Sequence, residues 1–393
     1  MTSTTISRRA RWGVPAIAAA AVIGGFAAQS LLSAANADEL PETTVAELVT
    51  HVMAADPQPL SGTVVYTADL GLPSLADLGL PNGLDAIAPA RPTDLLAGTS
   101  TMRVWTDAAD RSRITLQSAT SEFSVVSNAT EAWTYSSVDQ AVKHYTVDDP
   151  ARLADLSKQA PAPTDLPTPG GAALTVLAQV GQSSTLSLDP QTTVAGRSAY
   201  QLVLTPKSTT TLVGRITVAI DGKTWNPLKV TVWPRSDTQN PAIELGFTDV
   251  TYATPSDQVL TWSTPAGAHV EEVVVPLPTN DQLTSAAPTI TTTGTGWDQV
   301  ATVTGLPLDG LLGITDPTDS SGKPDTHVPD LARDYALPSD DVPQIAQSLL
   351  DALSTPVDGG RLVTSSLLSV LVMDDGRVLV GAVPGDVLIA AAR

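Results

Sequence analysis

Few residues of this chain are of the types that catalyse reactions or bind metal ions, and those few are widely spaced. Histidine occurs at His51, His144, His269 and His327, without an HExxH motif or a pair at the spacing of a zinc site. No GxSxG, P-loop or GxGxxG sequence is present, so acyl transfer and nucleotide binding lack their motifs. Cysteine is absent, which excludes disulfides, thiolate ligands and a lipid-modified N-terminal cysteine. We therefore expect no enzymatic activity, no cofactor and no metal site.

Two groups of acidic residues have simpler explanations than catalysis. The acidic segment 316–325 lacks the alternating ligand order and the closing Glu of a calcium-binding EF-hand loop, and we expect a solvated loop there. Asp148 and Asp149 resemble the carboxylate pair of a glycoside hydrolase. They precede Pro150 at an expected helix start, where Asp side chains accept hydrogen bonds from free backbone N–H groups, and we interpret them as capping residues.

The overall charge argues against nucleic acid as a partner. The 393 residues include 21 Lys and Arg against 41 Asp and Glu, which gives a formal net charge of −20. Such a chain repels phosphate backbones, and its basic residues are scattered rather than clustered. Only 4% of residues are aromatic, whereas Pro and Gly number 31 and 27. This composition is typical of many short strands joined by turns.

The N-terminus predicts export from the cytoplasm. Arg8, Arg9 and Arg11 precede an apolar run over residues 12–28, and Ala-Asn-Ala at 35–37 fits the small-residue pattern of a cleavage site. We expect residues 1–37 to be a secretory signal peptide and the protein to be extracytoplasmic. The alternative is an uncleaved membrane anchor through residues 12–32, because apolar character continues loosely to Leu32.

The elements after the signal segment are mostly strands. Residues 43–55 show helical apolar spacing, and the segments that follow alternate with period two, as half-buried antiparallel strands do. The apolar positions are Val64, Tyr66 and Ala68, Ile114 and Leu116, Phe123 and Val125, Trp133 and Tyr135, Leu202 and Leu204, Ile216, Val218 and Ile220, Leu228, Val230 and Val232, Ile243, Leu245 and Phe247, and finally Leu260 and Trp262. Short connections between these segments favour a meander.

Two regions interrupt this alternating pattern, and the last hundred residues form a separate series of elements. Asp-Leu-Gly-Leu-Pro occurs at 69–73 and again at 77–81. The second interruption, 149–180, includes a Pro-rich stretch at 161–169 between two expected short helices, at 151–156 and 172–180. Residues 276–296 have the composition of a linker. The remainder, 297–393, predicts a small α+β region with helices at 345–353 and 387–392 and a hairpin over 367–383.

The order of these motifs resembles the LolA/RseB-like superfamily of periplasmic lipoprotein carriers and sensors. The matching stretches are Leu60–Tyr66, Met102–Trp105, Asn128–Tyr135, Val194–Lys207 and Leu260–Val270. With its signal segment, Leu-Gly-Leu-Pro insertion and C-terminal region, the chain looks like the LolA-like proteins of high-GC Gram-positive bacteria. The resemblance implies an α+β fold: an incomplete antiparallel β-barrel over residues 38–275 with a helical lid and a small C-terminal α+β appendage, holding lipid chains in an apolar hollow.

The sequence departs from the carrier pattern at two points. Carriers of the LolA type have an arginine after the second strand that helps latch the lid, whereas residues 106–110 contain none and Arg111 and Arg113 follow slightly later. Residues 297–393 lie outside the carrier core. The latch and handoff mechanism therefore does not transfer directly from the resemblance.

The function we expect is binding of the acyl chains of a lipid or lipidated protein, in a carrier role, with a membrane-bound transporter or regulator as a further partner. The expected lining residues are Val64, Tyr66, Val104, Trp105, Ile114, Leu116, Phe123, Val125, Trp133, Tyr135, Ile216, Val218, Leu228, Val230, Leu245, Phe247 and Trp262, and the expected lid residues are Leu70, Leu72, Leu78, Leu80 and Leu84. Of the lining residues, Trp105 is adjacent to Val104 in the chain, so the two side chains would point to opposite faces of a strand. Three alternatives stay open: an RseB-like sensor that regulates a membrane partner, a structural envelope domain with a filled core, and a hydrolase whose residues assemble only in the fold.

Overall fold

The computed structural model describes residues 39–72, 98–118, 120–153, 168–275, 277, 289–305 and 353–393. Its contacts divide the chain into a larger unit, which contains the described residues of 39–70 and 98–277, and a smaller unit, which contains 71–72, 289–305 and 353–393. The expected signal peptide, the lid residues Leu78, Leu80 and Leu84, the acidic segment 316–325 and the helix expected at 345–353 lie outside the described residues. Within the described part of the chain, no helix is long and apolar enough to cross a membrane.

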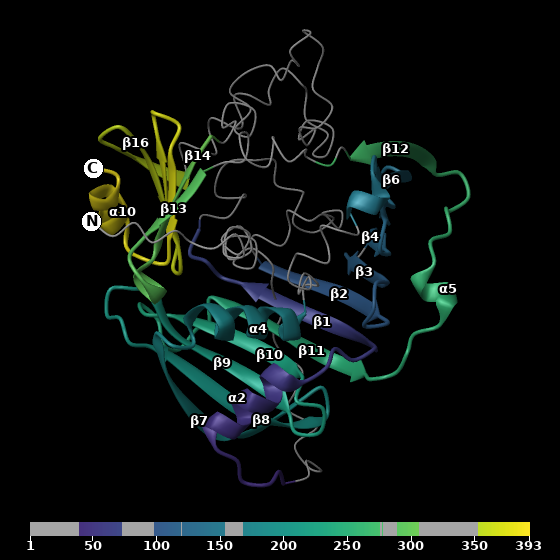
Figure 1. The fold of residues 1–393 in the computed structure, drawn as a ribbon, viewed down its shortest axis with the longest axis horizontal. Coiled ribbons are helices and arrows are strands. Elements are labelled where there is room, and N and C mark those ends of the chain that lie inside the picture. Colours follow the sequence, from purple (N-terminus) through teal and green to yellow (C-terminus); the bar gives the residue numbers. More distant parts are fainter. Residues whose placement is uncertain are drawn as a thin grey trace. The chain divides into compact units, whose positions relative to one another are not determined.

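The larger unit is built on one sheet of twelve strands, in the order β12-β6-β5-β4-β3-β2-β1-β11-β10-β9-β8-β7 (Figure 1). The strands are β1 Leu60–Ala68, β2 Gly98–Thr106, β3 Ser112–Gln117, β4 Glu122–Ser127, β5 Glu131–Ser136, β6 Ala141–Val147, β7 Ser184–Val194, β8 Arg197–Pro206, β9 Val213–Asp221, β10 Pro227–Pro234, β11 Ile243–Thr251 and β12 His269–Val275. Every pair is antiparallel except β12 with β6. In the part of the chain that the structure describes, β12 and β7 are the two edge strands, so the expected open, mainly antiparallel β structure is confirmed.

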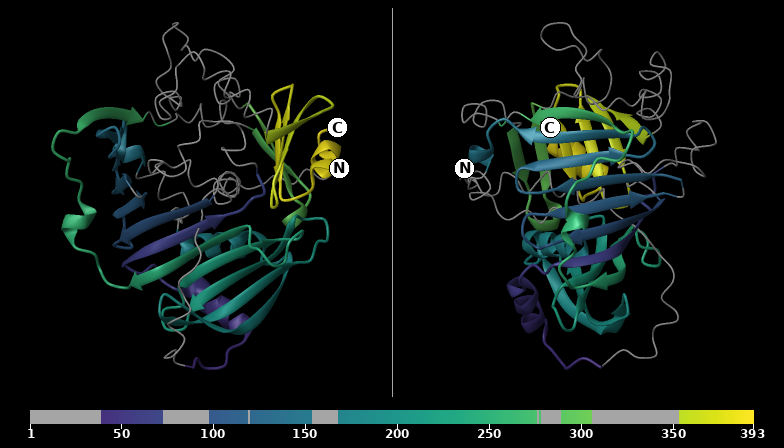
Figure 2. Two further views of the ribbon diagram at one scale, coloured as in Figure 1. Left: turned by 180° about the vertical axis from the view of Figure 1, so that it is seen from behind. Right: turned by 90° about the vertical axis from the view of Figure 1, so that its right-hand side faces the viewer.

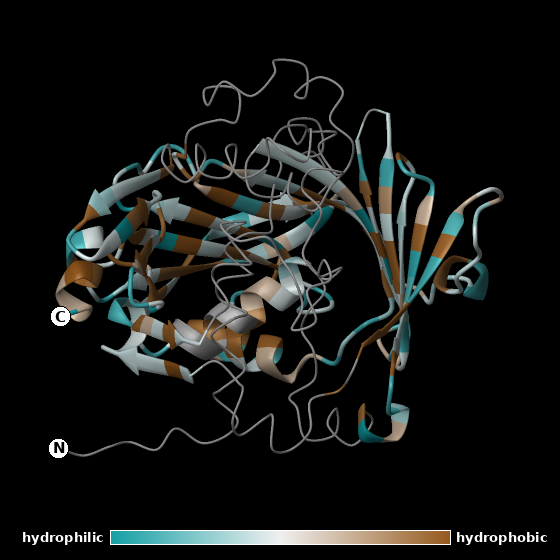
Figure 3. Cartoon of the chain, turned by 90° about the horizontal axis from the view of Figure 1, so that it is seen from above, coloured by the Kyte–Doolittle hydropathy of each residue, from teal (hydrophilic) through white to brown (hydrophobic). Residues whose placement is uncertain are grey.

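The sheet curves, which distinguishes its two faces (Figures 1 and 2). On the inner side, here called the concave face, α4 (Pro169–Val180) packs across β10 and β11. On the outer side, the convex face, the connection from β11 to β12 follows strands β2 to β6 and includes α5 (Asp257–Leu260), which contacts β2 and β3. Along the strands, Figure 3 shows alternating hydrophobic and hydrophilic residues, the pattern of a sheet whose faces differ in polarity.

The helices begin where the sequence supplies capping side chains. α2 (Val45–Ala54) starts after Thr44, whose hydroxyl accepts a hydrogen bond from Glu47 N while the Glu47 carboxylate accepts one from Thr44 N, a capping box. Asp149 Oδ1 accepts a hydrogen bond from Arg152 N at 2.9 Å, and residues 150–153 are helical, so the expected capping role is confirmed for Asp149. Asp148 instead accepts from Leu277 N at 2.9 Å.

One strand predicted in the larger unit is a helix in the structure, and strands β6, β7 and β12 were not predicted. We expected a final strand at Leu260 and Trp262, but the structure has the short helix α5 there, and Trp262 follows it outside any strand. Both side chains still serve packing, since Leu260 is buried and Trp262 stacks on the sheet. A pair of apolar residues two positions apart fits a strand and a helix end equally well, which explains the error.

The smaller unit is a sheet of six antiparallel strands, in the order β13-β14-β18-β17-β16-β15, with one helix, α10 (Gly385–Ala391). The strands are β13 Thr289–Thr293, β14 Val300–Thr304, β15 Ser354–Val357, β16 Gly360–Thr364, β17 Ser369–Met373 and β18 Val378–Gly381. The expected hairpin and C-terminal helix correspond to β17–β18 and α10. Strand β13 lies within the range we expected to be a linker, 276–296. The core of the smaller unit is centred on Leu371, Leu379 and Leu388.

Candidate functional site

The concave face is apolar across neighbouring strands. Residues that pair across an antiparallel ladder share a face, so the register defines it: Leu202 pairs with Val218, Val218 with Val230, and Val230 with Leu245. The series continues through Tyr66, which pairs with Leu245, and on β1 the next residue of the same face, Val64, pairs with Met102 and Phe247. From β2 it passes to β3 and β4 through the pairs Val104–Ile114, Ile114–Val125 and Leu116–Phe123. One apolar surface therefore extends from β8 to β4.

Burial along this surface is uneven. On β1, β8 and β9 the side chains of Val64, Leu202 and Val218 are 0% exposed. On β3 and β4, Ile114, Phe123 and Val125 are only half-buried. α4 lies over the well-buried part, where it contacts β10 and β11 and buries Ala173 and Leu177. The β3–β4 end of the concave face thus retains apolar surface that solvent or a ligand contacts.

The structure places thirteen of the seventeen expected lining residues on the concave face. They are Val64, Tyr66, Val104, Ile114, Leu116, Phe123, Val125, Ile216, Val218, Leu228, Val230, Leu245 and Phe247. The other four, Trp105, Trp133, Tyr135 and Trp262, belong to the convex face. Trp105 pairs with Arg113, Trp133 with Val126 and Tyr135 with Ser124, and these are the alternate positions of β3 and β4. The expectation that all seventeen line one surface is therefore corrected.

The convex-face tryptophans hold the β11–β12 connection against the sheet. Trp133 stacks on His144 with ring centroids 4.8 Å apart and on Trp262 at 6.4 Å. His144 Nδ1 lies 2.7 Å from Glu272 Oε2, which ties β6 to the edge strand β12. Val126 lies beside Trp133 and is 0% exposed. The convex face of the β4–β5 region is therefore covered by the β11–β12 connection, whereas the concave face there is not.

Arg111, which follows the second strand, also acts on the convex side. Its Nε donates to Asp107 Oδ2 at 2.7 Å, and its Nη1 donates to Asp257 Oδ1 of α5 at 2.8 Å. Asp107 Oδ1 accepts from the backbone N–H groups of Ala109 and Arg111, which closes the β2–β3 turn. In this turn Ala108 adopts a φ of 61°, a conformation that such hydrogen bonds stabilise. Arg111 joins α5 to the turn rather than reaching the concave face.

Tyr66 is the polar exception on the concave face. Its side chain is 0% exposed, and among the described residues its Oη has no hydrogen-bond partner. Burial raises the pKa of Tyr66, because the phenolate is poorly solvated inside the protein. The hydroxyl is thus a protonated donor in apolar surroundings. The position of Tyr66 in the alternation of β1 predicts an inward side chain, but no feature of the sequence indicates that its hydroxyl lacks an acceptor.

Two of the expected lid residues are described. Leu70 and Leu72 directly follow β1, are half-buried and lie outside any helix. The backbone N–H of Asp69 donates to Ala242 O at 2.8 Å, so this segment leaves the sheet beside the start of β11.

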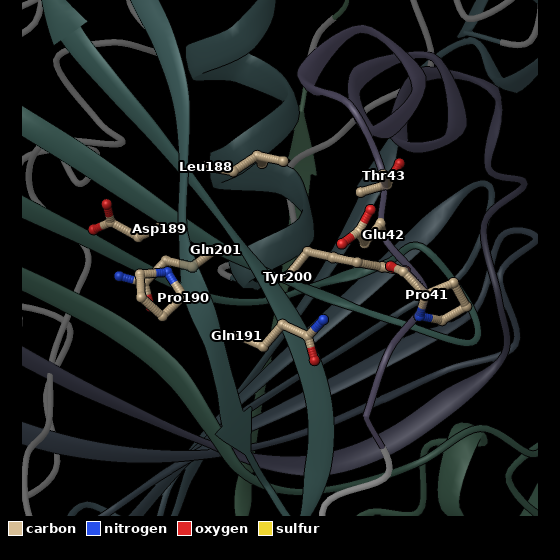
Figure 4. Close-up of a pocket in the computed structure, with 9 residues that line it drawn as sticks. All are labelled: Pro41, Glu42, Thr43, Leu188, Asp189, Pro190, Gln191, Tyr200 and Gln201. Carbon is tan, nitrogen blue, oxygen red and sulfur yellow. The ribbon is translucent and has the colours of Figure 1, made fainter.

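A cavity of about 420 Å³ lies between the segment before α2 and strands β7 and β8 (Figure 4). It is lined by Pro41, Glu42, Thr43, Leu188, Asp189, Pro190, Gln191, Tyr200 and Gln201. The Gln191 amide exchanges hydrogen bonds with the backbone of Leu40 at 3.0 and 2.9 Å, and Tyr200 Oη donates to Pro41 O at 2.9 Å. These polar groups attach the N-terminal segment to β7 and β8, and no motif in the sequence indicates them.

The described residues contain no group of three or more His, Cys, Asp and Glu able to hold a metal ion. His51 stacks on Trp225 at 4.2 Å and His144 on Trp133, while His327 lies outside the described ranges.

Comparisons with known proteins give matches only among solved structures. No family model matches the chain, and no curated protein does. A structure of MucB has 20% identity and a TM-score of 0.35, with 66% of this chain and 74% of that chain covered. The Pseudomonas aeruginosa MucA/MucB complex has 16% identity and a TM-score of 0.41, with 88% and 96% covered. A LolA superfamily protein from Nitrosomonas europaea has 8% identity and a TM-score of 0.22, with 56% and 99% covered. The solved structures to which this chain is similar thus include MucB and LolA superfamily proteins.

Proposed function

We propose that this protein binds the acyl chains of a lipid or lipidated protein on the concave face of its larger unit. The observation that carries this function is the continuous apolar surface from β8 to β4, whose β3–β4 end is only half-buried. A contiguous apolar surface of this kind marks a binding site for an apolar partner. An acyl chain suits it because the face is extended along the sheet and carries no charged side chain among the thirteen residues named above.

The energetics are sufficient for reversible binding. Each methylene removed from water contributes about 0.8 kcal/mol, so twelve buried methylenes contribute roughly 10 kcal/mol before the costs of association and ordering. Those costs amount to about 4 kcal/mol or more. The free energy of binding that remains after these costs is small enough to permit both uptake and release, which a carrier requires.

The cellular role that we propose follows from the N-terminal segment. Export through residues 1–37 brings the protein to the outer side of the cytoplasmic membrane, where it carries its acyl ligand and meets a membrane-bound transporter or regulator. We propose residues 38–275 as the binding domain and 297–393 as an accessory region, and we propose no enzymatic activity.

The first experiment is to purify the protein from a bacterial host that exports it, extract it with organic solvent under denaturing conditions, and search for stoichiometric lipid by mass spectrometry. We expect bound acyl lipid, and affinity that rises by about tenfold or more for each two methylenes added to an offered chain. Cargo transferred to acceptor vesicles supports a carrier, whereas cargo retained until a membrane protein is added supports a sensor. A folded protein that neither carries lipid nor binds an acyl probe contradicts the proposal.

A further inference from the structure

The Tyr66 hydroxyl occupies a central position on the concave face. Strand β1 lies between β11 and β2, and Tyr66 pairs with Leu245 on one side and with Ser100 on the other. Apart from Ser100, the nearest side chains of the same face are apolar, including Val64 and Met102. Tyr66 is 0% exposed, and its Oη has no hydrogen-bond partner in the described part of the chain.

Such a hydroxyl is unfavourable unless something accepts its hydrogen bond. A buried donor without an acceptor loses its hydration and regains nothing, whereas Phe would fill nearly the same space without that cost. The other buried phenol of the same face, Tyr200, shows the usual arrangement, because its Oη donates to Pro41 O at 2.9 Å. Burial keeps Tyr66 protonated by raising its pKa, so the group stays a donor wherever the protein is folded.

The surroundings define the acceptor. Water is poorly suited, since a buried water needs two or more polar partners and the neighbours of Tyr66 are mainly apolar. The fitting molecule is apolar over most of its length and has one hydrogen-bond acceptor. The carbonyl oxygen at the head of an acyl chain, in an ester or an amide, has this chemistry.

We propose that Tyr66 is a ligand-binding residue, whose Oη donates a hydrogen bond to the carbonyl oxygen of a bound acyl ester or amide. This inference rests on the proposed acyl binding and specifies where the head of the chain lies. From β1 the chain would extend across β2 and β3 to β4, three strand spacings of about 4.8 Å each. It would end against Leu116 and Phe123, at the half-buried end of the face.

Binding at Tyr66 also requires the face above β1 to open, because Oη is enclosed in this structure. Among the described helices, α4 contacts β11, the immediate neighbour of β1, so we expect α4 to shift when a ligand binds.

The test compares two probes that differ only at the carbonyl group. Diheptanoyl phosphatidylcholine and its diheptyl ether analogue have equal chains and the same headgroup. We expect the wild-type protein to bind the ester about five- to tenfold more tightly, as one hydrogen bond to a buried donor provides. Tyr66→Phe should bind both probes equally, with an affinity close to that of the wild type for the ether. Tyr200→Phe is the matched control and should keep the preference for the ester.

A second pair of probes distinguishes the sources of the carbonyl. A peptide O-acylated on one serine and its uncharged O-alkyl counterpart replace the phospholipids, and tighter binding of the acyl peptide than of the phospholipid ester indicates a lipidated protein as the natural ligand. Equal binding of ester and ether in both pairs by the wild type overturns the role of Tyr66 while leaving acyl binding intact. Failure to bind any of the four probes contradicts the proposed function instead.

An isotope-edited infrared spectrum provides a measurement that does not depend on a variant. With a ¹³C-labelled carbonyl in the bound ester, a hydrogen bond from Tyr66 lowers the carbonyl stretching frequency relative to the same ester in hydrocarbon. An unshifted band for ester bound to the wild-type protein would overturn the proposal, even if Tyr66→Phe does not fold.

Discussion

Phe123 and Trp133 lie on neighbouring strands, β4 and β5, but their side chains point to opposite faces of the sheet. Phe123 pairs with Leu116 and with Ser136, whereas Trp133 pairs with Val126. Phe123 therefore belongs to the concave face, and Trp133 belongs to the convex face, where it stacks on Trp262. The two aromatic residues have different roles although both were expected to line one hollow.

Substitution of these two residues separates binding from packing. Phe123→Glu introduces a charge on the half-buried end of the concave face, where an acyl chain would have to desolvate it, and we expect acyl affinity to fall at least about a hundredfold. Trp133→Ala should lower the free energy of unfolding by about 2 kcal/mol through lost packing, with acyl affinity unchanged. Titration with a fluorescent fatty acid and chemical unfolding measure the two effects. Equal loss of affinity in the two variants contradicts the assignment of faces.

The sequence identified the strands better than the faces. Period two shows which residues of one strand share a side, but it does not relate the parity of one strand to that of the next. In β4 both parities include apolar residues, Val125 on the concave face and Val126 on the convex face. In β5 the alternation is clean, but its apolar residues face the convex side, where Trp133 and Tyr135 contact Trp262. The error for Trp133 and Tyr135 thus has a physical cause: alternation shows that one side of a strand is covered, but not which face of the sheet that side belongs to.

Tyr66 and Tyr200 provide a matched pair for stability. Tyr200→Phe removes a hydrogen bond to Pro41 O and should lower the free energy of unfolding by about 1 kcal/mol. Tyr66→Phe removes a buried hydroxyl without a partner and should leave this free energy unchanged or raise it by about 1 kcal/mol. Urea unfolding of the ligand-free proteins makes the comparison. A Tyr66→Phe variant less stable than Tyr200→Phe would show that Oη is satisfied within the free protein.

The edge strand β12 illustrates what only the fold reveals. Only its first two residues, His269 and Val270, belong to a matching stretch, and neither the strand nor its parallel pairing with β6 was predicted from a sequence that favours a meander. The pairing depends on contacts distant in sequence, such as His144 with Glu272 and Trp133 with Trp262. Local periodicity contains no information on such contacts.

The stacking of Trp262 on Trp133 predicts local rather than global effects. Trp262→Ala removes an aromatic contact of about 0.5–1.5 kcal/mol, and the segment that it attaches leads into β12. We expect faster amide hydrogen exchange over residues 261–275, detected by mass spectrometry, with unchanged exchange in β8–β10. Trp297→Ala, in the smaller unit, is the control and should leave exchange over 261–275 as in the wild type. Uniformly faster exchange throughout the sheet would contradict a local role for Trp262.

The pH dependence of stability tests the turn between β2 and β3. Burial on its own would raise the pKa of Asp107, but hydrogen bonds from the Arg111 side chain and from the N–H groups of Ala109 and Arg111 outweigh it and hold the pKa below its ordinary value. A carboxyl with a lower pKa in the folded than in the unfolded state stabilises the fold above the unfolded pKa, about 3.9. That contribution is lost as the pH falls through the folded pKa.

Asp107→Ala should therefore lower the free energy of unfolding by about 2 kcal/mol near neutral pH, and by clearly less when the measurement is repeated at about pH 3. Asp107→Asn keeps an oxygen that accepts from the backbone but loses the charge opposite Arg111, so its effect should lie between those of Ala and the wild type. Urea unfolding at a series of pH values measures all three proteins. If the deficit of Asp107→Ala is the same at both pH values, the turn is held by shape and backbone geometry, and the charge of Asp107 contributes nothing to it.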